Sequence, residues 1–452
     1  MKKKISILIN SDLYVRNYLE SGAFKKIFKK FDVNLILSEN EVFNKKKVFS
    51  FFDKKKIKNI RYSQSELKKF NKYLLKNFFL NKRKSKTTDY IIKQYLNKKF
   101  HWDGENMLKT FCLFPLRLLV WIKKNLEYFI SLILKKNVYR NKINSNLKDI
   151  LKKINPDLII FPYQDAHILN FDIIKGNYSN LTMGLTDNWD NLSSRAQFDI
   201  KPSYITVWGE QTKQHAIKFH HFRKDKIFSI GTPRFSSYFA DRNKNINSNF
   251  KFPYFLFLES FNNYDNFFLI KKLEDYIGRN KIFSNYKIIY RPHPWQKKNI
   301  KILNEKKFKN LIIDPQLRTN YIKRNFSRAF QPNLKYYSSL IKNSKLVITG
   351  PTSMLIEASI FYKKILLLGH QNNSSSPYNL ELENYEHLKN VKRFPNLIIN
   401  KDINEFTKDL DKVYKIKIDK KKINKIRNYY YNYSGEKYQD RIYKVVKKIL
   451  NV

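Results

Sequence analysis

A stretch that suits phosphate chemistry runs from Lys287 to Pro294 and reads Lys-Ile-Ile-Tyr-Arg-Pro-His-Pro. Its apolar beginning is long enough for a short buried strand. Pro292 and Pro294 then end that strand, because proline cannot donate to a sheet ladder. Open α/β sheets bind ligands at the carboxyl ends of their strands. We therefore expect Arg291 and His293 to be displayed where they can meet an anion.

A second stretch, residues 346–358, repeats this arrangement. An apolar run is followed by a small-residue turn with Thr352 and Ser353, and then by a helical pattern. Backbone N–H groups and the dipole at a helix N-terminus favour negative charge, and hydroxyls add donors or cap the helix. Glu357 lies one turn into the helix, within reach of a ribose hydroxyl. Taken alone, a His-Pro at a strand end and a Ser or Thr that caps a helix are each more often structural than functional. The occurrence of both motifs in this order, each after a buried strand, favours a binding site.

Arg-Pro-His-Pro followed about sixty residues later by Thr-Ser and Glu resembles the GT-B glycosyltransferases of bacterial surface polysaccharide synthesis. The similar branch has a His-Pro and a Ser-Ser/Thr motif and includes sialyltransferases, capsule Kdo transferases and CDP-glycerol glycerophosphotransferases. The resemblance covers mainly residues 250–370, with weaker similarity at 155–240. It implies that His293, Thr352 and Ser353 bind the donor phosphate and that Glu357 contacts the ribose. It also implies a nucleotide-sugar substrate with no separate cofactor, and it leaves the donor open.

Further candidates follow predicted strands in the first half of the chain. Asp165 and His167 come after a strand at 158–161, where a carboxylate or imidazole could serve as general base or bind the acceptor. A helix cap in a surface loop is the competing interpretation. Arg234 follows a strand at 227–230 and could meet a phosphate or carboxylate bidentately, unless it makes a surface ion pair. Asp12 is a weaker candidate for the base.

The segment 186–195 gathers hydrogen-bonding side chains around one tryptophan. Asp187, Trp189 and Asp190 could form a site wall, with the indole ring as a stacking platform for a sugar or base. An ordered structural loop explains the same composition. Similar runs occur in surface-polysaccharide transferases. Asp187 and Asp190 are also alternatives to Asp165 as the general base.

These candidates need strands that alternate with helices, which predicts an α/β fold of two facing Rossmann-like domains with a cleft between them. We place a first domain at 1–240, with a helical insertion at about 41–150, and a nucleotide-donor domain at 250–415. The polar segment 240–250 suits a linker. Terminal helices at 416–452 could pack back on the first domain.

The chain is strongly basic, with 89 Lys and Arg against 38 Asp and Glu in 452 residues, a formal charge of +51. No helix-turn-helix, zinc-finger or RNA-recognition signature accompanies this charge, so nucleic acid is not an expected partner. An anionic membrane surface or phosphate-bearing substrates suit it better. The apolar segment 111–134 fits either a buried helix pair or a helix in the membrane interface.

The single cysteine, Cys112, excludes an internal disulfide and a cysteine metal site. No Asp-x-Asp motif is convincing, so we expect no bound metal. A cytoplasmic location is expected, with the inner face of the membrane as an open alternative.

The predicted function is metal-independent transfer of a sugar from a nucleotide donor to a surface polysaccharide or lipid-linked acceptor. A glycerophosphotransferase or sugar epimerase with the same cleft is one alternative. A basic, non-enzymatic protein that binds membrane or nucleic acid is the other.

Overall fold

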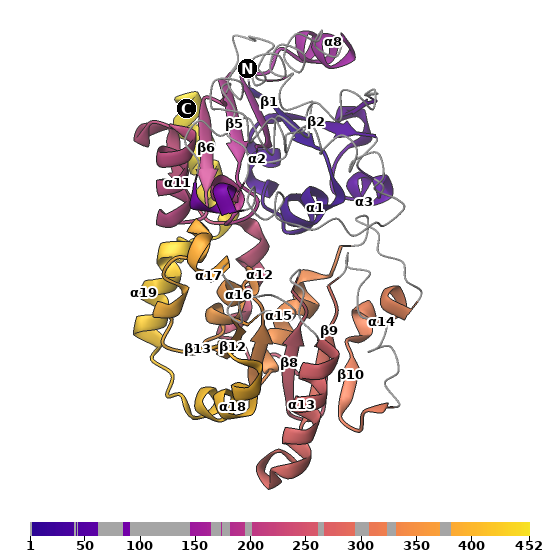
Figure 1. The fold of residues 1–452 in the computed structure, drawn as a ribbon. Coiled ribbons are helices and arrows are strands. Elements are labelled where there is room, and N and C mark those ends of the chain that lie inside the picture. The colour runs from indigo at the N-terminus through magenta and orange to yellow at the C-terminus, as the bar shows by residue number, and fades with distance from the viewer. Residues whose placement is uncertain are drawn as a thin grey trace, which may run out of the picture.

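The computed structural model describes residues 2–39, 42, 44–61, 85–90, 145–163, 173, 181–194, 201–260, 266–293, 307–322, 331–370 and 381–452. It contains two parallel sheets of seven and six strands, each accompanied by helices and stacked one above the other in Figure 1. The predicted fold class, a two-domain α/β fold of the GT-B type, is confirmed. Asp165, His167 and the segment 111–134 lie outside the described residues.

The first sheet has the order β3-β2-β1-β4-β5-β6-β7. Its strands are β1 (Lys4–Ile9), β2 (Asp32–Ser38), β3 (Ile57–Ile60), β4 (Leu158–Pro162), β5 (Leu181–Leu185), β6 (Tyr204–Val207) and β7 (Ile227–Ser229). Its helices are α1 (Asp12–Tyr14), a π-helix (Val15–Glu20), α2 (Lys25–Lys30), α3 (Lys45–Phe49), α8 (Ser145–Ile154), α10 (Asn191–Ser194) and α11 (Glu210–His220). The strand order reverses between β1 and β4, and such a switch point is where open α/β sheets bind ligands.

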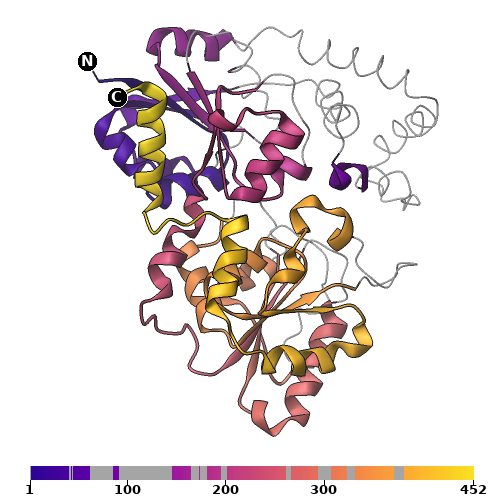
Figure 2. The same cartoon turned by 90° about the vertical axis from the view of Figure 1, so that its left-hand side faces the viewer.

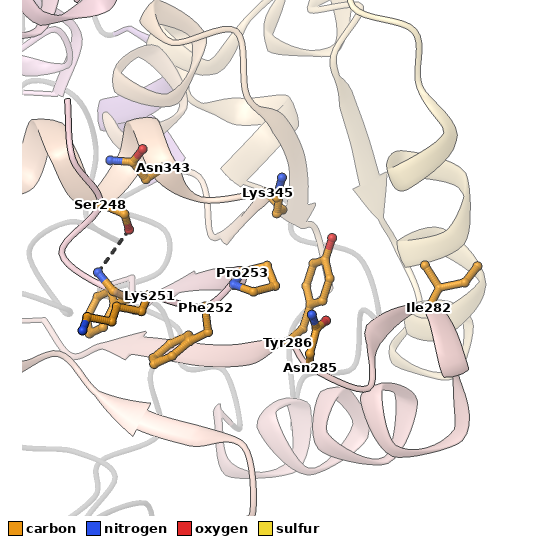
Figure 3. A pocket seen from close by; sticks show the side chains of 10 residues that line it. Ser248, Lys251, Phe252, Pro253, Ile282, Asn285, Tyr286, Asn343 and Lys345 are labelled. Atoms are coloured by element: carbon orange, nitrogen blue, oxygen red, sulfur yellow. Dashed lines mark hydrogen bonds between the residues drawn. The ribbon is translucent and has the colours of Figure 1, made fainter. Parts of the chain in front are cut away.

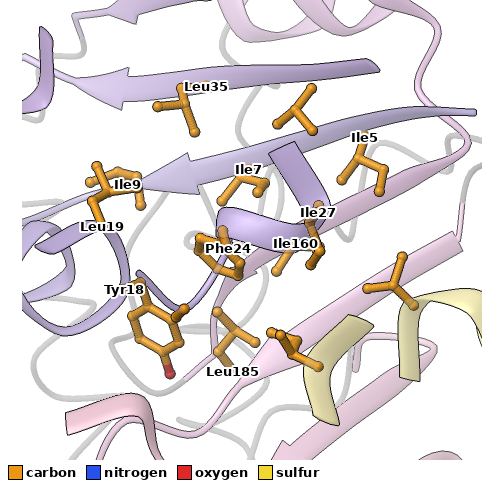
Figure 4. Packing of buried hydrophobic residues seen from close by; sticks show 14 of the residues in the cluster. Ile5, Ile7, Ile9, Tyr18, Leu19, Phe24, Ile27, Leu35, Ile160 and Leu185 are labelled. Carbon is orange, nitrogen blue, oxygen red and sulfur yellow. The ribbon is translucent and has the colours of Figure 1, made fainter. Parts of the chain in front are cut away.

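The strands form where the sequence has continuous apolar runs, as expected for parallel sheets that are covered on both faces. β1 and β4 are buried almost throughout. Figure 4 shows Ile7 of β1 and Ile160 of β4 packing with Phe24 and Ile27, which belong to the α2 segment.

The second sheet has the order β10-β9-β8-β11-β12-β13, with its switch point between β8 and β11. Its strands are β8 (Tyr254–Leu258), β9 (Lys287–Arg291), β10 (Leu311–Ile313), β11 (Leu346–Thr349), β12 (Lys364–Leu368) and β13 (Leu397–Asn400). Its helices are α13 (Asn266–Arg279), α14 (Pro315–Ile322), α15 (Leu334–Asn343), α16 (Met354–Ile360), α17 (Glu381–Asn384) and α18 (Phe406–Lys415).

Two segments connect the sheets. The chain leaves the first sheet through α12 (Ser236–Arg242), and it returns through α19 (Lys420–Tyr430) to the final helix, α20 (Tyr438–Leu450). In Figure 2 the yellow terminal helix lies against the first sheet's unit, and both chain termini lie in that unit. Tyr431, Phe235 and Phe239 pack together where the two connections meet.

The strands predicted at 158–161, at 227–230 and at the two motifs form as β4, β7, β9 and β11. β3 and β13 were not predicted, because each is four residues with polar positions inside it or at its end. Among the described residues, no helix combines the length and apolar composition that crossing a bilayer requires.

Candidate functional site

The segment that follows β1 supplies a buried arginine. Arg16 and Asn17 lie on the π-helix, a rare geometry that is frequent at functional sites. The Arg16 Nε donates to Asn17 Oδ1 at 3.0 Å, and Asn17 Nδ2 donates to Asp187 Oδ1 at 2.8 Å. Asp187 follows β5, and Arg16 and Asp187 are 8% and 5% exposed. The carboxyl ends of β1 and β5 are thus joined by one hydrogen-bonded chain.

Arg234 follows β7, where Thr232 Oγ1 accepts from its backbone N at 3.4 Å. Its guanidinium lies over the rings of Trp208 and Phe235, with centroids at 5.1 and 4.9 Å. The Nη2 reaches Glu357 Oε1 on α16 at 3.3 Å. This ion pair joins the two halves of the molecule.

Glu357 is 4% exposed and has further partners. Tyr238 of α12 donates its hydroxyl to Glu357 Oε2 at 2.8 Å, and Ser353 Oγ donates to Oε1 at 3.4 Å. Burial and the Glu357 charge raise the pKa of Tyr238 well above its usual value, so the phenol stays a donor. The carboxylate is therefore fixed by groups from three segments.

Electrostatics links these groups into one unit, which we call the interdomain polar cluster: Arg16, Asn17, Asp187, Arg234, Tyr238 and Glu357. Burial and the nearby Arg234 charge lower the pKa of Arg16 to about 10, opposed by Asp187 and Glu357. The Arg16 guanidinium therefore stays charged at neutral pH. Among the described residues, the enclosed Arg234 Nε has no hydrogen-bond partner, and the enclosed Nη2 meets Glu357 Oε1 as an ion pair without hydrogen-bond geometry. Two such cations can hold an anionic group, and the carboxylates can accept hydroxyl protons.

In the Arg-Pro-His-Pro motif, Arg291 has protein partners. It forms a buried ion pair with Asp314 and donates to Gln316 Oε1 at 2.9 Å. Its guanidinium stacks on the Tyr337 ring at 3.8 Å. The side chain is 2% exposed, so this geometry suits bracing the strand end. The predicted contact of Arg291 with a donor stays a prediction.

Tyr337 of α15 connects the two motifs. Besides stacking on Arg291, it donates its hydroxyl to Met354 Sδ at 3.5 Å, in the first turn of α16. The Glu357 charge also contributes to raising the pKa of Tyr337, after burial. The motif after β9 and the motif after β11 are therefore in contact through one side chain.

His293 is more accessible than Arg291 and is held through its backbone. Its N–H donates to Glu259 Oε2 at 2.7 Å, while Asn266 Nδ2 donates to Glu259 Oε1 at 3.1 Å. Burial lowers the pKa of His293 to about 4, so the imidazole is neutral at pH 7. A neutral imidazole has one N–H with which to bind an oxygen anion.

Thr352 and Ser353 lie at the start of α16, and both are partly exposed. Thr352 Oγ1 accepts from the Met354 backbone N at 3.3 Å, which caps the first turn. Ser353 contacts Glu357 as described above. Their predicted role in binding phosphate stays a prediction, compatible with their exposure.

The Trp189 ring lies in the core and is 2% exposed. It meets His387 and Tyr430 edge to face, with centroids at 5.1 and 5.6 Å. Asp190 Oδ2 accepts from Ser194 Oγ at 3.0 Å, at the start of α10. This geometry favours the ordered structural loop over the sugar platform for Trp189 and Asp190, whereas Asp187 joins the polar cluster.

Sequence reasoning missed Arg16, Asn17 and Tyr238. A cation within two turns of the first strand's carboxyl end was an available signal for Arg16, because that edge of the sheet collects ligands. Tyr238 had no signal, since its partner Glu357 is 119 positions away.

A shallow pocket of about 550 Å³ lies elsewhere. Figure 3 shows its lining, including Phe252, Pro253, Tyr286 and Lys345. These residues precede β8, β9 and β11, so the pocket is at the amino edge of the second sheet. It is separate from the polar cluster. In the described ranges, no group of three or more His, Cys, Asp or Glu is placed to hold a metal ion.

Comparisons with solved structures show the fold. A putative UDP-N-acetylglucosamine 2-epimerase from Listeria monocytogenes matches with a TM-score of 0.55 at 9% identity, covering 99% of this chain and 96% of that one. The co-structure of S. aureus MnaA with UDP matches with a TM-score of 0.52 at 11% identity, covering 100% and 97%. The UDP-GlcNAc 2-epimerase of Methanocaldococcus jannaschii matches with a TM-score of 0.51 at 14% identity, covering 98% and 99%.

No family model matches the chain, and no curated protein matches it. The His-Pro and Ser-Ser/Thr branch inferred from the motifs is not confirmed by these comparisons. At these identities the likeness establishes a GT-B-like architecture over nearly the whole length of the chain.

Proposed function

We propose that this chain is a sugar-nucleotide enzyme, and that it transfers the sugar to a surface polysaccharide or lipid-linked acceptor. The observation that carries the proposal is the ion pair between Arg234 and Glu357, which joins residues at the carboxyl edges of both sheets. Ligands bind at these edges in open α/β sheets. The fold neighbours support the substrate class, since they include MnaA bound to UDP and a UDP-GlcNAc 2-epimerase.

The donor's phosphates are the groups that Arg16 and Arg234 suit best. A departing nucleotide diphosphate gains negative charge as the sugar–oxygen bond breaks, and preorganised cations and N–H donors stabilise that charge. His293, Thr352 and Ser353 add neutral donors. Because these groups supply the stabilisation themselves, the proposal requires no metal. Glu357 would bind a ribose hydroxyl through one of its carboxylate oxygens. In the structure Oε1 accepts from Ser353 and Oε2 accepts from Tyr238.

The acceptor hydroxyl must lose its proton during transfer, and a carboxylate of the first half is the proposed base. Asp165 remains our predicted choice. Asp187 is the alternative from the first half, because it belongs to the polar cluster and accepts from Asn17 Nδ2 at 2.8 Å.

Epimerisation of a UDP-sugar is the second candidate, because two of the matching solved structures with TM-scores above 0.5 are UDP-GlcNAc 2-epimerases and a third is MnaA with UDP. An epimerase acts on the donor alone, whereas a transferase needs an acceptor. The test is to incubate the protein with UDP-GlcNAc, UDP-glucose, CMP-sialic acid or CDP-glycerol and follow the products by chromatography and NMR. Donor isomerisation without acceptor would establish the epimerase. Nucleotide release that requires an added glycan or lipid acceptor would establish the transferase.

Binding is tested separately, by thermal unfolding with CMP, CDP, UDP, GDP and ADP. A ligand that binds the folded state raises the melting temperature. If nucleotides of one base raise the melting temperature of the wild type and do not raise that of Arg16→Gln, the result would support the proposed site. If no nucleotide shifts the transition at millimolar concentration, the proposal is wrong and the non-enzymatic membrane- or nucleic-acid-binding alternative gains support.

A further inference from the structure

A second group of cations lies away from the interdomain polar cluster, where the two connections between the sheets meet. Arg242 is the last residue of α12, and Arg427 is in the last turn of α19. Both guanidiniums lie over the ring of Phe239, at 5.5 and 5.2 Å from its centroid. We propose that Arg242, Arg427 and Lys420 form a binding site for a phosphate group of a small soluble molecule.

The two arginines are close enough to repel each other. Burial and the Arg242 charge lower the pKa of Arg427 to about 10. Arg427 is 3% exposed, yet neither it nor Arg242 forms an ion pair with a carboxylate in the described ranges. The nearest acids in sequence are engaged elsewhere: Asp241 accepts from Ser338 Oγ at 2.9 Å, and Asp419 caps α19 at Lys422. Buried charges are ordinarily paired, so this arrangement favours an anion.

Cation–π packing explains only part of this arrangement. Stacking on an aromatic ring satisfies the face of a guanidinium, while its N–H groups at the edge still need acceptors. Arg242 Nε and Nη1 and Arg427 Nε are enclosed and have no hydrogen-bond partner in the described structure. Arg427 Nη1 and Nη2 do have acceptors, the amides of Asn424 and Asn428 at 2.7 and 2.9 Å. The amides leave the positive charge uncompensated.

Tyr362 is a second, independent feature of the same place. Its φ is 56°, a left-handed conformation that is strained for a bulky residue. Arg242 and Lys420 both lie over its ring, at 5.5 and 5.6 Å, and its hydroxyl donates to Asn424 Oδ1 at 3.1 Å. The strained backbone thus presents an aromatic ring to two cations.

Phosphate is the anion that fits this chemistry. Guanidinium groups bind phosphate oxygens through parallel N–H bonds, and an ammonium group adds a point charge. Lys420 is exposed and Arg242 is half-buried with Nε and Nη1 enclosed, so the site is open to solvent at Lys420 and only in part at Arg242. Because α12 and α19 are the two connections between the sheets, a phosphate held by both would fix them to each other.

The test is calorimetric titration with inorganic phosphate and pyrophosphate, against sodium chloride at equal ionic strength. It is done in an Arg16→Gln background, which removes the proposed donor site. We expect saturable binding that Arg242→Gln weakens at least tenfold, because a charge-assisted hydrogen bond is lost. Arg223→Gln is the control, since Arg223 is exposed and paired with Asp225 at 3.0 Å. Arg242→Lys, which keeps the charge, should recover part of the affinity.

Each other outcome would overturn the proposal. Binding that is absent, or equal in Arg242→Gln and Arg223→Gln, removes the site, provided circular dichroism shows all variants folded. The last measurement is co-sedimentation of the protein with phosphatidylglycerol vesicles, which tests binding to a lipid headgroup. Vesicle binding that requires Arg242, without any effect of soluble phosphate, would replace the small molecule by a lipid headgroup.

Discussion

The Arg234 guanidinium lies 3.3 Å from the Glu357 carboxylate, although the two residues follow strands of different sheets. Both side chains are nearly buried, at 12% and 5% exposed. A charge left alone at such a place is costly, whereas the pair together can be close to neutral in its net effect on stability. The pair therefore ties the two halves of the molecule to each other at the proposed site.

We predict that Glu357→Gln destabilises the protein by about 2–4 kcal/mol, because it leaves the Arg234 charge without its carboxylate. Arg234→Met should cost a similar amount, since Glu357 then loses its cation. The double variant should cost less than the sum of the two. Urea unfolding of the four proteins measures this double-mutant cycle. Strict additivity would mean that the 3.3 Å contact carries no coupling.

We expect the two functional side chains of the Arg-Pro-His-Pro motif to have different roles: Arg291 stabilises the fold, and His293 binds the nucleotide. Arg291→Gln should lower stability by about 3–5 kcal/mol, because Asp314 is fully buried and would lose its cation. His293→Ala should leave the melting temperature within a few degrees of the wild type and abolish the nucleotide-induced shift. Thermal unfolding with and without nucleotide measures both effects. A nucleotide shift that survives in His293→Ala would remove His293 from the site.

In the Arg-Pro-His-Pro motif, some features could be predicted from the sequence and others could not. Prolines end β9 for a local reason, so the end of the strand could be predicted, and His293 after it is partly exposed. The partners of Arg291 could not be predicted, because Asp314 and Tyr337 lie 23 and 46 positions away along the chain. Only the fold brings the three residues together. The same holds for Glu357, whose helix was predictable while its partners Tyr238 and Arg234 come from another part of the chain. For Trp189 the sequence left a site wall and an ordered loop open, and its contacts with His387 and Tyr430 come from distant parts of the chain.

Histidines whose pKa is lowered by burial make stability depend on pH, and His293, described above, is one of them. Burial, with the charges of neighbouring histidines, lowers the pKa of His215 to about 3. Burial also lowers the pKa values of His220 and His387 to about 4. The unfolded chain therefore binds more protons than the native state below about pH 6.5. Full stability is present above that pH, and it is lost as the pH falls toward 4.

Each histidine contributes up to about 1.4 kcal/mol per pH unit in this window. Urea unfolding at pH 7.5, 6 and 5 measures the slope. His387→Gln should reduce the slope of unfolding free energy against pH by the equivalent of about one proton. This holds even if the substitution lowers stability by removing the contact between His387 Nδ1 and Ser193 Oγ, which is 3.2 Å long. A slope that is unchanged in His387→Gln would show that other groups titrate.

The close contact between α11 and α19 gives the last prediction. A Cβ added at Gly209 would lie 2.6 Å from the backbone carbon of Tyr430, and backbone cannot move aside as a flexible side chain can. Gly209→Ala should therefore push the returning helix away from the first sheet's unit and destabilise by about 2–4 kcal/mol, in the range of other packing strain. Gly278→Ala is the matched control, because a Cβ there meets nothing within 4 Å and the residue lies inside α13. This substitution should stabilise by about 0.5–1 kcal/mol through the better helix propensity of alanine. If Gly209→Ala is as well tolerated as Gly278→Ala in urea unfolding, α19 does not pack on α11 in solution, and the second connection between the sheets is looser than the structure has it.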